Sequence, residues 1–259
     1  TQIAFNASLG FENVAKRGRP DVMNAQEFAE FKKEYYEDAQ KYEGSTTPVP
    51  AQYANPSSVT DGTDWYDVLL RTAHAQNYNL SLQSGSEKVK SAVNLNYNKT
   101  EGTIINSYAE RFAARSNNEF KASDRITFGL DLSGSYIRRQ VQSGLGEGRN
   151  IIHSSFLMDP ALKYKNDDGT YPISFSPPGM FGNANYYLVC RDRKNPVRTI
   201  RGTANAYGQI ELLKDLKYRL SANADLGNWR QEVWVPSYVS GGMFSAPPNP
   251  AYGGYYTGN

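Results

Sequence analysis

Few residues of this chain are arranged for catalysis. His74 and His153 are the only histidines, and neither stands near a Cys or Ser in a recognisable nucleophile pattern. The Asp167-Asp168 pair lacks the spacing of a calcium loop and indicates a turn. Cys190 is the single cysteine, so it provides neither an intrachain disulfide nor a metal cluster. Scattered carboxylates leave glycoside hydrolysis open, because the separation of two carboxylates defines that chemistry. The sequence thus identifies no catalytic residue, metal site or cofactor.

Aromatic and arginine side chains are better candidates for binding. Flat aromatic rings can stack on sugars, and several aromatics fall in segments expected to be loops. Arg111 and Arg115 fall on the polar side of an expected strand, where they could line a route for a ligand. Both groups have a simpler alternative: loop aromatics pack loop against loop, and polar strand residues hydrate and cross-link a wall. The candidate ligand-binding residues are Tyr186, Tyr187, Trp229, Trp234, Tyr238, Arg111 and Arg115.

The elements that must position these residues are strands. Apolar and polar side chains alternate over segments of about ten residues or more, as half-buried strands require. In residues 74–84, for example, Tyr78, Leu80 and Leu82 alternate with Asn79 and Ser81. The alternation recurs in residues 88–97, 125–139 and 218–226. Alternation alone does not decide between a soluble sandwich and a membrane sheet, but segments of this length suit a tilted membrane strand.

The connections between strands alternate in length. Tight reversals are expected at residues 84–87, 122–124 and 213–215, and long polar excursions at about 12–73, 99–108, 140–198 and 230–259. In an up-and-down antiparallel sheet, successive connections lie at opposite ends. All short turns are therefore expected at one end and all long loops at the other, which is typical of an outer-membrane β-barrel.

Composition is compatible with such a barrel. The chain has 259 residues, a formal net charge of +2 and a mean hydropathy of −0.64. It has no run of about eighteen apolar residues, which excludes a transmembrane helix but not a barrel. Nothing suggests a nucleic-acid partner. Thr1 opens directly into a strand-like segment without a signal peptide, so we expect an internal piece of a longer protein.

The first long excursion should contain two helices. Asn24 and Glu27 have the spacing of a capping box, and Phe28, Phe31, Tyr35, Ala39 and Tyr42 recur at helical spacing. We expect this amphipathic helix to pack through those residues. Asp64 similarly precedes Trp65, Val68 and Leu69 and should cap a short second helix.

An ordered set of matches resembles the SusC/RagA-like TonB-dependent transporters of Bacteroidetes outer membranes. The matching stretches cover nearly the whole chain and are densest from residue 62 to 139. They are Gly62-Thr63-Asp64-Trp65-Tyr66-Asp67-Val68-Leu69-Leu70-Arg71, residues 74–86, Tyr97, Glu101-Gly102-Thr103-Ile104-Ile105-Asn106-Ser107, Arg111-Phe112, Arg115, Asn195-Pro196-Val197, Thr203-Ala204-Asn205-Ala206-Tyr207 and Leu216-Lys217-Tyr218-Arg219.

The resemblance implies an all-β, antiparallel up-and-down transmembrane barrel of roughly twenty-two strands, with helical extracellular loop insertions. This chain would supply about seven strands from the N-terminal part of that barrel, without the plug domain. It further implies import of glycans or peptides, a SusD-like surface lipoprotein as a lid, energy from the TonB complex through the missing plug, and a place in the cell outer membrane among its lipids. The long loops at 12–73 and 140–198 could meet the lid.

Two other functions stay open from the sequence. A soluble or surface carbohydrate-binding β-protein would be monomeric in buffer without detergent. A glycan hydrolase would lose turnover when one specific carboxylate is replaced.

Overall fold

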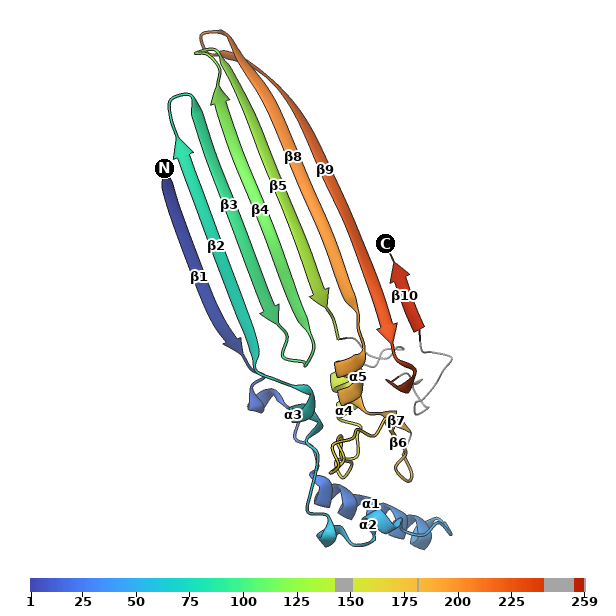
Figure 1. Ribbon diagram of the computed structural model, residues 1–259. Coiled ribbons are helices and arrows are strands. Elements are labelled where there is room, and N and C mark those ends of the chain that lie inside the picture. The colour runs from blue at the N-terminus through green and yellow to red at the C-terminus, as the bar shows by residue number, and fades with distance from the viewer. Residues whose placement is uncertain (143–150, 181, 240–253, 259) are drawn as a thin grey trace.

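The computed structural model describes residues 1–142, 151–180, 182–239 and the backbone of 254–258. Its main element is an antiparallel sheet of eight strands in the order β1-β2-β3-β4-β5-β8-β9-β10 (Figure 1). Each strand pairs with its neighbour in the order, and β1 and β10 form the two edges. The strands are β1 Gln2–Glu12, β2 Ala73–Gly85, β3 Val89–Glu101, β4 Tyr108–Lys121, β5 Ile126–Gln140, β8 Pro196–Leu213, β9 Leu216–Val235 and β10 Gly254–Gly258.

The seven expected strands are all present, and two boundaries near the C-terminus differ from the prediction. The loop expected at 230–259 begins later, because β9 continues to Val235. It also ends earlier, because the Gly/Tyr-rich residues 254–258 form β10 and pair with residues 231–235 of β9. Backbone pairing with an existing edge can make a strand from a segment that lacks alternation.

The three tight reversals lie together at one end of the sheet, as expected (Figure 1). Ser86 Oγ accepts a hydrogen bond from the Val89 amide at 3.1 Å, and Ser123 Oγ accepts one from the Ile126 amide at 3.1 Å. At the third turn Asp215 adopts a positive φ of 68°, which Asp tolerates better than most residues. The long connections and their helices lie at the other end.

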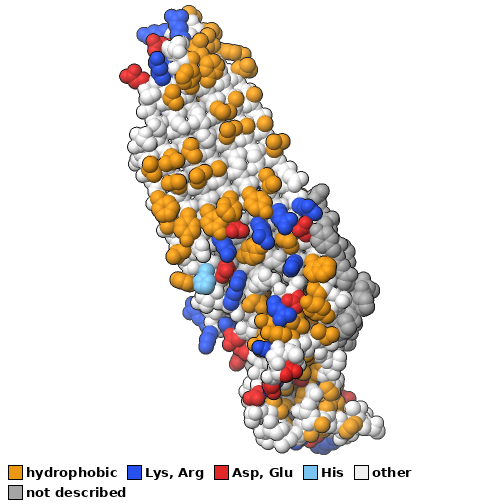
Figure 2. Space-filling model, viewed as in Figure 1, with side chains coloured by type: hydrophobic (Ala, Val, Ile, Leu, Met, Phe, Trp, Pro, Cys, Tyr) orange, Lys and Arg blue, Asp and Glu red, His pale blue; other side chains and the backbone are white. Residues whose placement is uncertain are grey.

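The sheet has one apolar face and one polar face. On the apolar face, large side chains are exposed in this chain, including Ile3 at 67 %, Leu220 at 67 % and Leu226 at 74 %. Figure 2 shows hydrophobic side chains in bands across the sheet. The polar face carries the alternate residues of the same strands, among them Asn79, Asn96, Arg111, Ser133 and Arg201.

Aromatic rows bound the apolar face. At the loop end Tyr78, Tyr97, Phe112 and Tyr136 are successive partners on β2 to β5. The ring centroids of Tyr97 and Phe112 are 4.6 Å apart. At the turn end Phe120 lies opposite Phe128. Phe120 is eight positions after Phe112 on β4, which is about 26 Å along the strand. A strand tilt of 35–45° would reduce this to a height of about 20 Å, close to the apolar band of a membrane barrel.

The first long insertion follows β1 and is largely helical. It contains η1 Lys16–Gly18, α1 Ala25–Tyr42, α2 Ala51–Ala54, η2 Pro56–Ser58 and α3 Trp65–Leu69. The capping box of α1 is confirmed: the Glu27 amide donates to Asn24 Oδ1 at 3.0 Å, and the Asn24 amide donates to Glu27 Oε2 at 2.9 Å. The Asp64 cap of α3 is confirmed by bonds from the amides of Tyr66 and Asp67.

The predicted packing face of α1 is wrong. The helix is buried through Ala25, Ala29, Lys32 and Tyr36, one residue away from the aromatic series. Of that series, Phe28 and Ala39 are half-buried, whereas Phe31, Tyr35 and Tyr42 are 49 %, 57 % and 70 % exposed. Ala25 and Ala29 allow close approach of neighbouring segments, and Tyr36 is the buried aromatic of α1, in a hydrophobic cluster with Ala29 and Tyr53.

The second insertion follows β5. Its described elements are α4 Ile151–Ser155, the paired β6 Ser174–Phe175 and β7 Asn183–Ala184, and α5 Tyr186–Asp192; η3 Ser237–Val239 follows β9. These elements build a hydrophobic core together with α3. Its buried members include Trp65, Leu69, Ile151, Met158, Phe175, Leu188, Val189 and Val239. Among the described residues, no helix is long and apolar enough to cross a membrane.

Asp159 links the two insertions. Its buried carboxylate accepts a hydrogen bond from the Tyr53 hydroxyl at 2.7 Å, and its carbonyl accepts one from Trp65 Nε1 at 3.2 Å. The Thr63 amide donates to the Pro160 carbonyl at 2.7 Å. The described parts of the two insertions thus pack together as one unit.

Candidate functional site

The polar face has a shallow cavity in the middle of the sheet. It has a volume of about 560 Å³ and is lined by residues of β2, β3, β4, β5 and β8. Alternation places every second side chain of these strands on this face. Its polar lining includes Arg111, Arg115, Arg201, Asn79, Asn94 and Asn96.

Hydrogen bonds between neighbouring strands hold the asparagines of this cavity. Asn94 Nδ2 donates to Asn79 Oδ1 at 3.0 Å and to Ser81 Oγ at 2.8 Å. Asn96 Nδ2 donates to Asn77 Oδ1 at 3.0 Å. The ladder fixes the wall of the cavity, as the simpler interpretation of the polar strand residues expects.

The three arginines of the cavity carry charge that the wall does not neutralise. Arg115 Nε donates to the neutral Asn117 Oδ1 at 3.0 Å. In the described part of the chain, no carboxylate lies within salt-bridge distance of Arg111, Arg115 or Arg201. The cavity therefore presents guanidinium groups suited to carboxylate, sulfate or phosphate groups of a ligand.

The sequence predicts Trp229 in a long loop. The structure instead places it in β9, on the polar face of the sheet. It belongs to β9, and the residues directly across the sheet are Thr199 on β8, Ile137 on β5 and Arg111 on β4. Its side chain is 48 % exposed. The structure thus places one aromatic candidate and one arginine candidate in the same row of the polar face.

Trp234 is also a strand residue. It lies near the end of β9, five positions after Trp229, so alternation places it on the opposite face. Its backbone forms a bridge with Lys194, and its side chain is 46 % exposed. The two tryptophans therefore do not share a site.

The remaining aromatic candidates lie in the outer loops, around α5. Tyr186 is 7 % exposed and belongs to the loop core. Tyr187 stacks on Tyr171, with ring centroids 5.3 Å apart and planes 12° apart. Partial burial raises the pKa of Tyr187, and the hydrogen bond with Tyr171 raises it further. These contacts favour the simpler interpretation, in which loop aromatics pack loop against loop.

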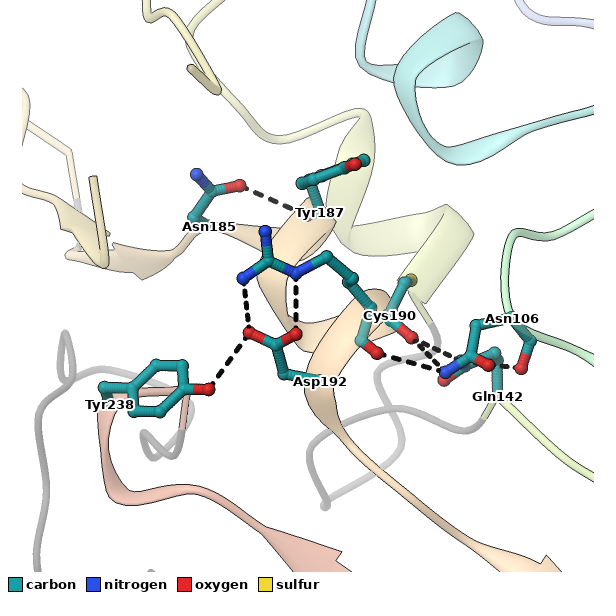
Figure 3. Close-up of polar contacts among 8 residues, drawn as sticks. Asn106, Gln142, Asn185, Tyr187, Cys190, Asp192 and Tyr238 are labelled. Carbon is teal, nitrogen blue, oxygen red and sulfur yellow. Dashed lines mark hydrogen bonds and ion pairs between the residues drawn. The ribbon is translucent and has the colours of Figure 1, made fainter. Parts of the chain in front are cut away.

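Tyr238 joins η3 to α5 (Figure 3). Its hydroxyl donates to Asp192 Oδ2 at 3.0 Å, and Arg191 contacts both oxygens of Asp192, at 2.6 and 2.7 Å. The hydrogen bonds from Arg191 are the main reason that the pKa of Asp192 lies below its ordinary value. The ring of Tyr238 stays 39 % exposed, so it is the most accessible of the three loop tyrosines.

Asn185 organises these loops and was not singled out from the sequence. Its side chain is fully buried, and its Oδ1 accepts from the Tyr187 amide at 3.2 Å as the cap of α5 (Figure 3). Its Nδ2 donates to the carbonyls of Tyr164 and Pro172 at 2.7 and 2.9 Å. An Asn immediately before a short apolar run is a helix-start signal that could have identified it.

Two findings bear on chemistry. Among the described residues, no group of three or more His, Cys, Asp or Glu could hold a metal ion. Cys190 is buried, and burial raises the pKa of its thiol to about 12.

These features define a class of protein: a segment of antiparallel barrel wall with one apolar face, one polar face, and long structured loops at one end. The known proteins to which the chain is similar fit this description. The chain is 26 % identical over 250 residues to TonB-dependent receptor P3 of Formosa agariphila, covering 93 % of this chain. It is 31 % identical over 137 residues to TonB-dependent receptor P26 of the same organism, covering 53 % of this chain. No family model matches the chain.

Solved structures give the same result for the fold. The RagAB peptide transporter superposes with a TM-score of 0.69 at 18 % identity, over 95 % of this chain. The RagAB peptide importer in its open-open state gives a TM-score of 0.70 at 18 % identity. The resemblance to SusC/RagA-like TonB-dependent transporters is thereby confirmed. The chain spans 23 % and 13 % of the two receptors and about 30 % of the matched RagAB chains.

Proposed function

We propose that this chain is the N-terminal part of the barrel of a SusC-like TonB-dependent transporter, which imports glycans or peptides across the cell outer membrane with a SusD-like lipoprotein lid. One observation carries the proposal: a sheet whose two faces differ in polarity and whose loops differ in length at its two ends. A transporter wall needs this combination, because one face contacts lipid and the other lines a water-filled lumen.

The apolar face supports a place in the membrane. Exposed Ile, Leu and Phe side chains on this scale would be unfavourable in water, and large exposed apolar patches mark contact with a partner or a membrane. The aromatic rows at both ends of the face suit the two interfaces of a bilayer. The loop end would then be extracellular and the turn end periplasmic.

The polar face supports a role in cargo passage. Arg111, Arg115 and Arg201 offer charged hydrogen-bond donors, and Trp229 offers an aromatic surface in the same row as Arg111. A peptide presents carboxylates and a glycan presents ring faces or acidic substituents, so both cargo classes fit. We propose these four residues as cargo contacts, with Tyr238 as the accessible loop aromatic.

The first insertion supports a docking site for the lid. Phe31, Tyr35 and Tyr42 are exposed on α1, at the far end of the loops from the sheet (Figure 1). Beside this helix is a mainly apolar cavity of about 570 Å³. Its lining includes Val22, Met23, Phe28, Trp65, Phe156 and Met180. We propose that a SusD-like lipoprotein covers this surface, and that TonB acts through a plug domain encoded outside this chain.

The test is uptake and co-purification with the intact parent receptor. An Arg111→Gln/Arg115→Gln receptor should be correctly assembled but should bind and import its cargo more weakly. A Phe31→Ser/Tyr35→Ser receptor should retain less of its lipoprotein, whereas Lys33→Ser on the same helix should not. The proposal is contradicted if the parent receptor neither co-purifies with a lipoprotein nor supports growth on any glycan or peptide.

A further inference from the structure

Three arginines lie side by side on the apolar face, at its loop end. Arg138 on β5, Arg198 on β8 and Arg230 on β9 are successive partners across the sheet. Alternation places them on the same face as Tyr136 and Ile200. Figure 2 shows basic side chains gathered just beyond a row of large hydrophobic ones. We call Arg138, Arg198 and Arg230 the arginine row.

The positive charge of the arginine row is only partly neutralised by its surroundings. Like charges directly opposite one another in a sheet are destabilising. Glu232 contacts both Arg198 and Arg230, each at 3.1 Å. Arg138 lies over the Tyr108 ring at 5.7 Å and has no salt bridge among the described residues. Among the described residues, Glu232 is thus the one carboxylate in ion-pair contact with the row, and the side chains of Arg198 and Arg230 remain 40 % and 51 % exposed.

Charged residues on the neighbouring strands do not cancel the net positive charge at this level of the apolar face. Lys99 on β3 and Glu110 on β4 occupy the same level of the apolar face, and Glu110 lies between Lys99 and Arg138. With Glu232, two carboxylates stand against four cations at this end of the face. Glu110 accepts a hydrogen bond from the Tyr97 hydroxyl at 2.8 Å. One level further out, Glu101 is within 3.8 Å of Arg71 and 3.3 Å of His74. The excess positive charge is therefore centred on the arginine row.

The position of the row indicates what it meets. Arg138 is two residues beyond Tyr136, which is about 7 Å along the strand toward the long loops. Aromatic rows of membrane proteins lie at the level of the lipid headgroups. Side chains just beyond such a row, pointing away from the lumen, face headgroups of the leaflet on the loop side.

We propose that the arginine row binds the phosphate groups of a phosphorylated glycolipid in the outer leaflet. Guanidinium groups form paired hydrogen bonds with phosphate, and three adjacent ones can hold more than one phosphate of a single headgroup. The bound lipid supplies the negative charge that the protein lacks at this level. This inference rests on the proposed membrane location but not on cargo or lid.

Binding is measured by native mass spectrometry of the parent receptor, delipidated in detergent and titrated with diphosphorylated lipid A. Arg138→Gln/Arg230→Gln should weaken binding roughly 30-fold, about fivefold for each charge removed. Arg139→Gln is the matched control, because Arg139 is the next residue of β5 and lies on the polar face; it should bind like the wild type. Heat-modifiable migration in gels verifies that each variant is folded.

Dephosphorylated lipid A distinguishes the phosphate from the acyl chains. The affinity of the wild-type receptor for dephosphorylated lipid A should be no higher than the affinity of the double variant for lipid A. Equal binding of lipid A by the wild-type and double-variant receptors overturns the proposal, as does equal binding of lipid A with and without phosphates. Cargo uptake is measured separately, so a failed lipid interaction leaves the transporter proposal intact.

Discussion

Removing one hydroxyl group should loosen the outer loops without changing their shape. In Tyr53→Phe the ring still fills its fully buried position, but the 2.7 Å hydrogen bond to Asp159 is lost. Asp159 is 1 % exposed, and within the described ranges its carboxylate would keep a single hydrogen bond, from the Ala161 amide at 2.8 Å. A hydrogen bond to a charged group contributes about 1.5–3 kcal/mol. The opening equilibrium of the first insertion should therefore rise roughly 10- to 100-fold.

Hydrogen exchange followed by mass spectrometry measures this opening in the parent receptor. Amides of α1 and α2 should exchange faster in Tyr53→Phe by that factor, while amides of β3 and β4 should be unchanged. Tyr42→Phe is the matched control, because Tyr42 is 70 % exposed on the same insertion and should have little effect. If both variants exchange alike, Asp159 does not link the two insertions in the way described.

Three further outcomes are expected. Asn185→Ala removes the α5 cap and two buried hydrogen bonds, so its loops should open more easily by about 2–4 kcal/mol in the same exchange experiment; protection equal to the wild type would contradict this. The pKa of Asp192 is lowered from its ordinary value of 3.8 in the folded protein. Its contribution to stability is therefore complete above 3.8 and is lost as the pH falls through the lower, folded-state pKa. Near-UV circular dichroism should show an acid transition that is absent in Asp192→Asn. Leu132→Arg on the apolar face should destabilise the receptor in liposomes by about 2–4 kcal/mol in urea, whereas Ser135→Arg on the polar face should cost much less; equal costs would refute the assignment of the faces.

The sheet was largely predictable because its signals are local. Residues 74–84 alternate strictly, and Ser86, Ser123 and Asp215 supply turn chemistry at the places where the chain reverses. The Asn24 capping box was predictable for the same reason. By contrast, β10 forms through pairing with β9, and its Gly/Tyr-rich sequence contains no alternation that could announce it.

The candidate site was predicted less well because side-chain environment depends on tertiary packing. Lys32 is buried in α1 although it is charged, and Phe31 is exposed although it is apolar, so the helical pattern indicated the wrong face. Trp229 was assigned to a loop because the end of β9 was placed too early. The arginine row could not be seen in the sequence, since its members come from three strands and only the register aligns them.

The opposite environments of the two faces can be measured directly. Single cysteines replace Leu132 and Ser135, which lie on opposite faces of β5, and carry spin labels in the parent receptor reconstituted in liposomes. Native Cys190 should stay unlabelled near neutral pH, since it is buried and the pKa of its thiol is raised to about 12. The label at 132 should collide mainly with oxygen dissolved in lipid, and the label at 135 mainly with a water-soluble nickel complex. Equal accessibility of both labels to the nickel complex would contradict a membrane wall with a water-filled lumen.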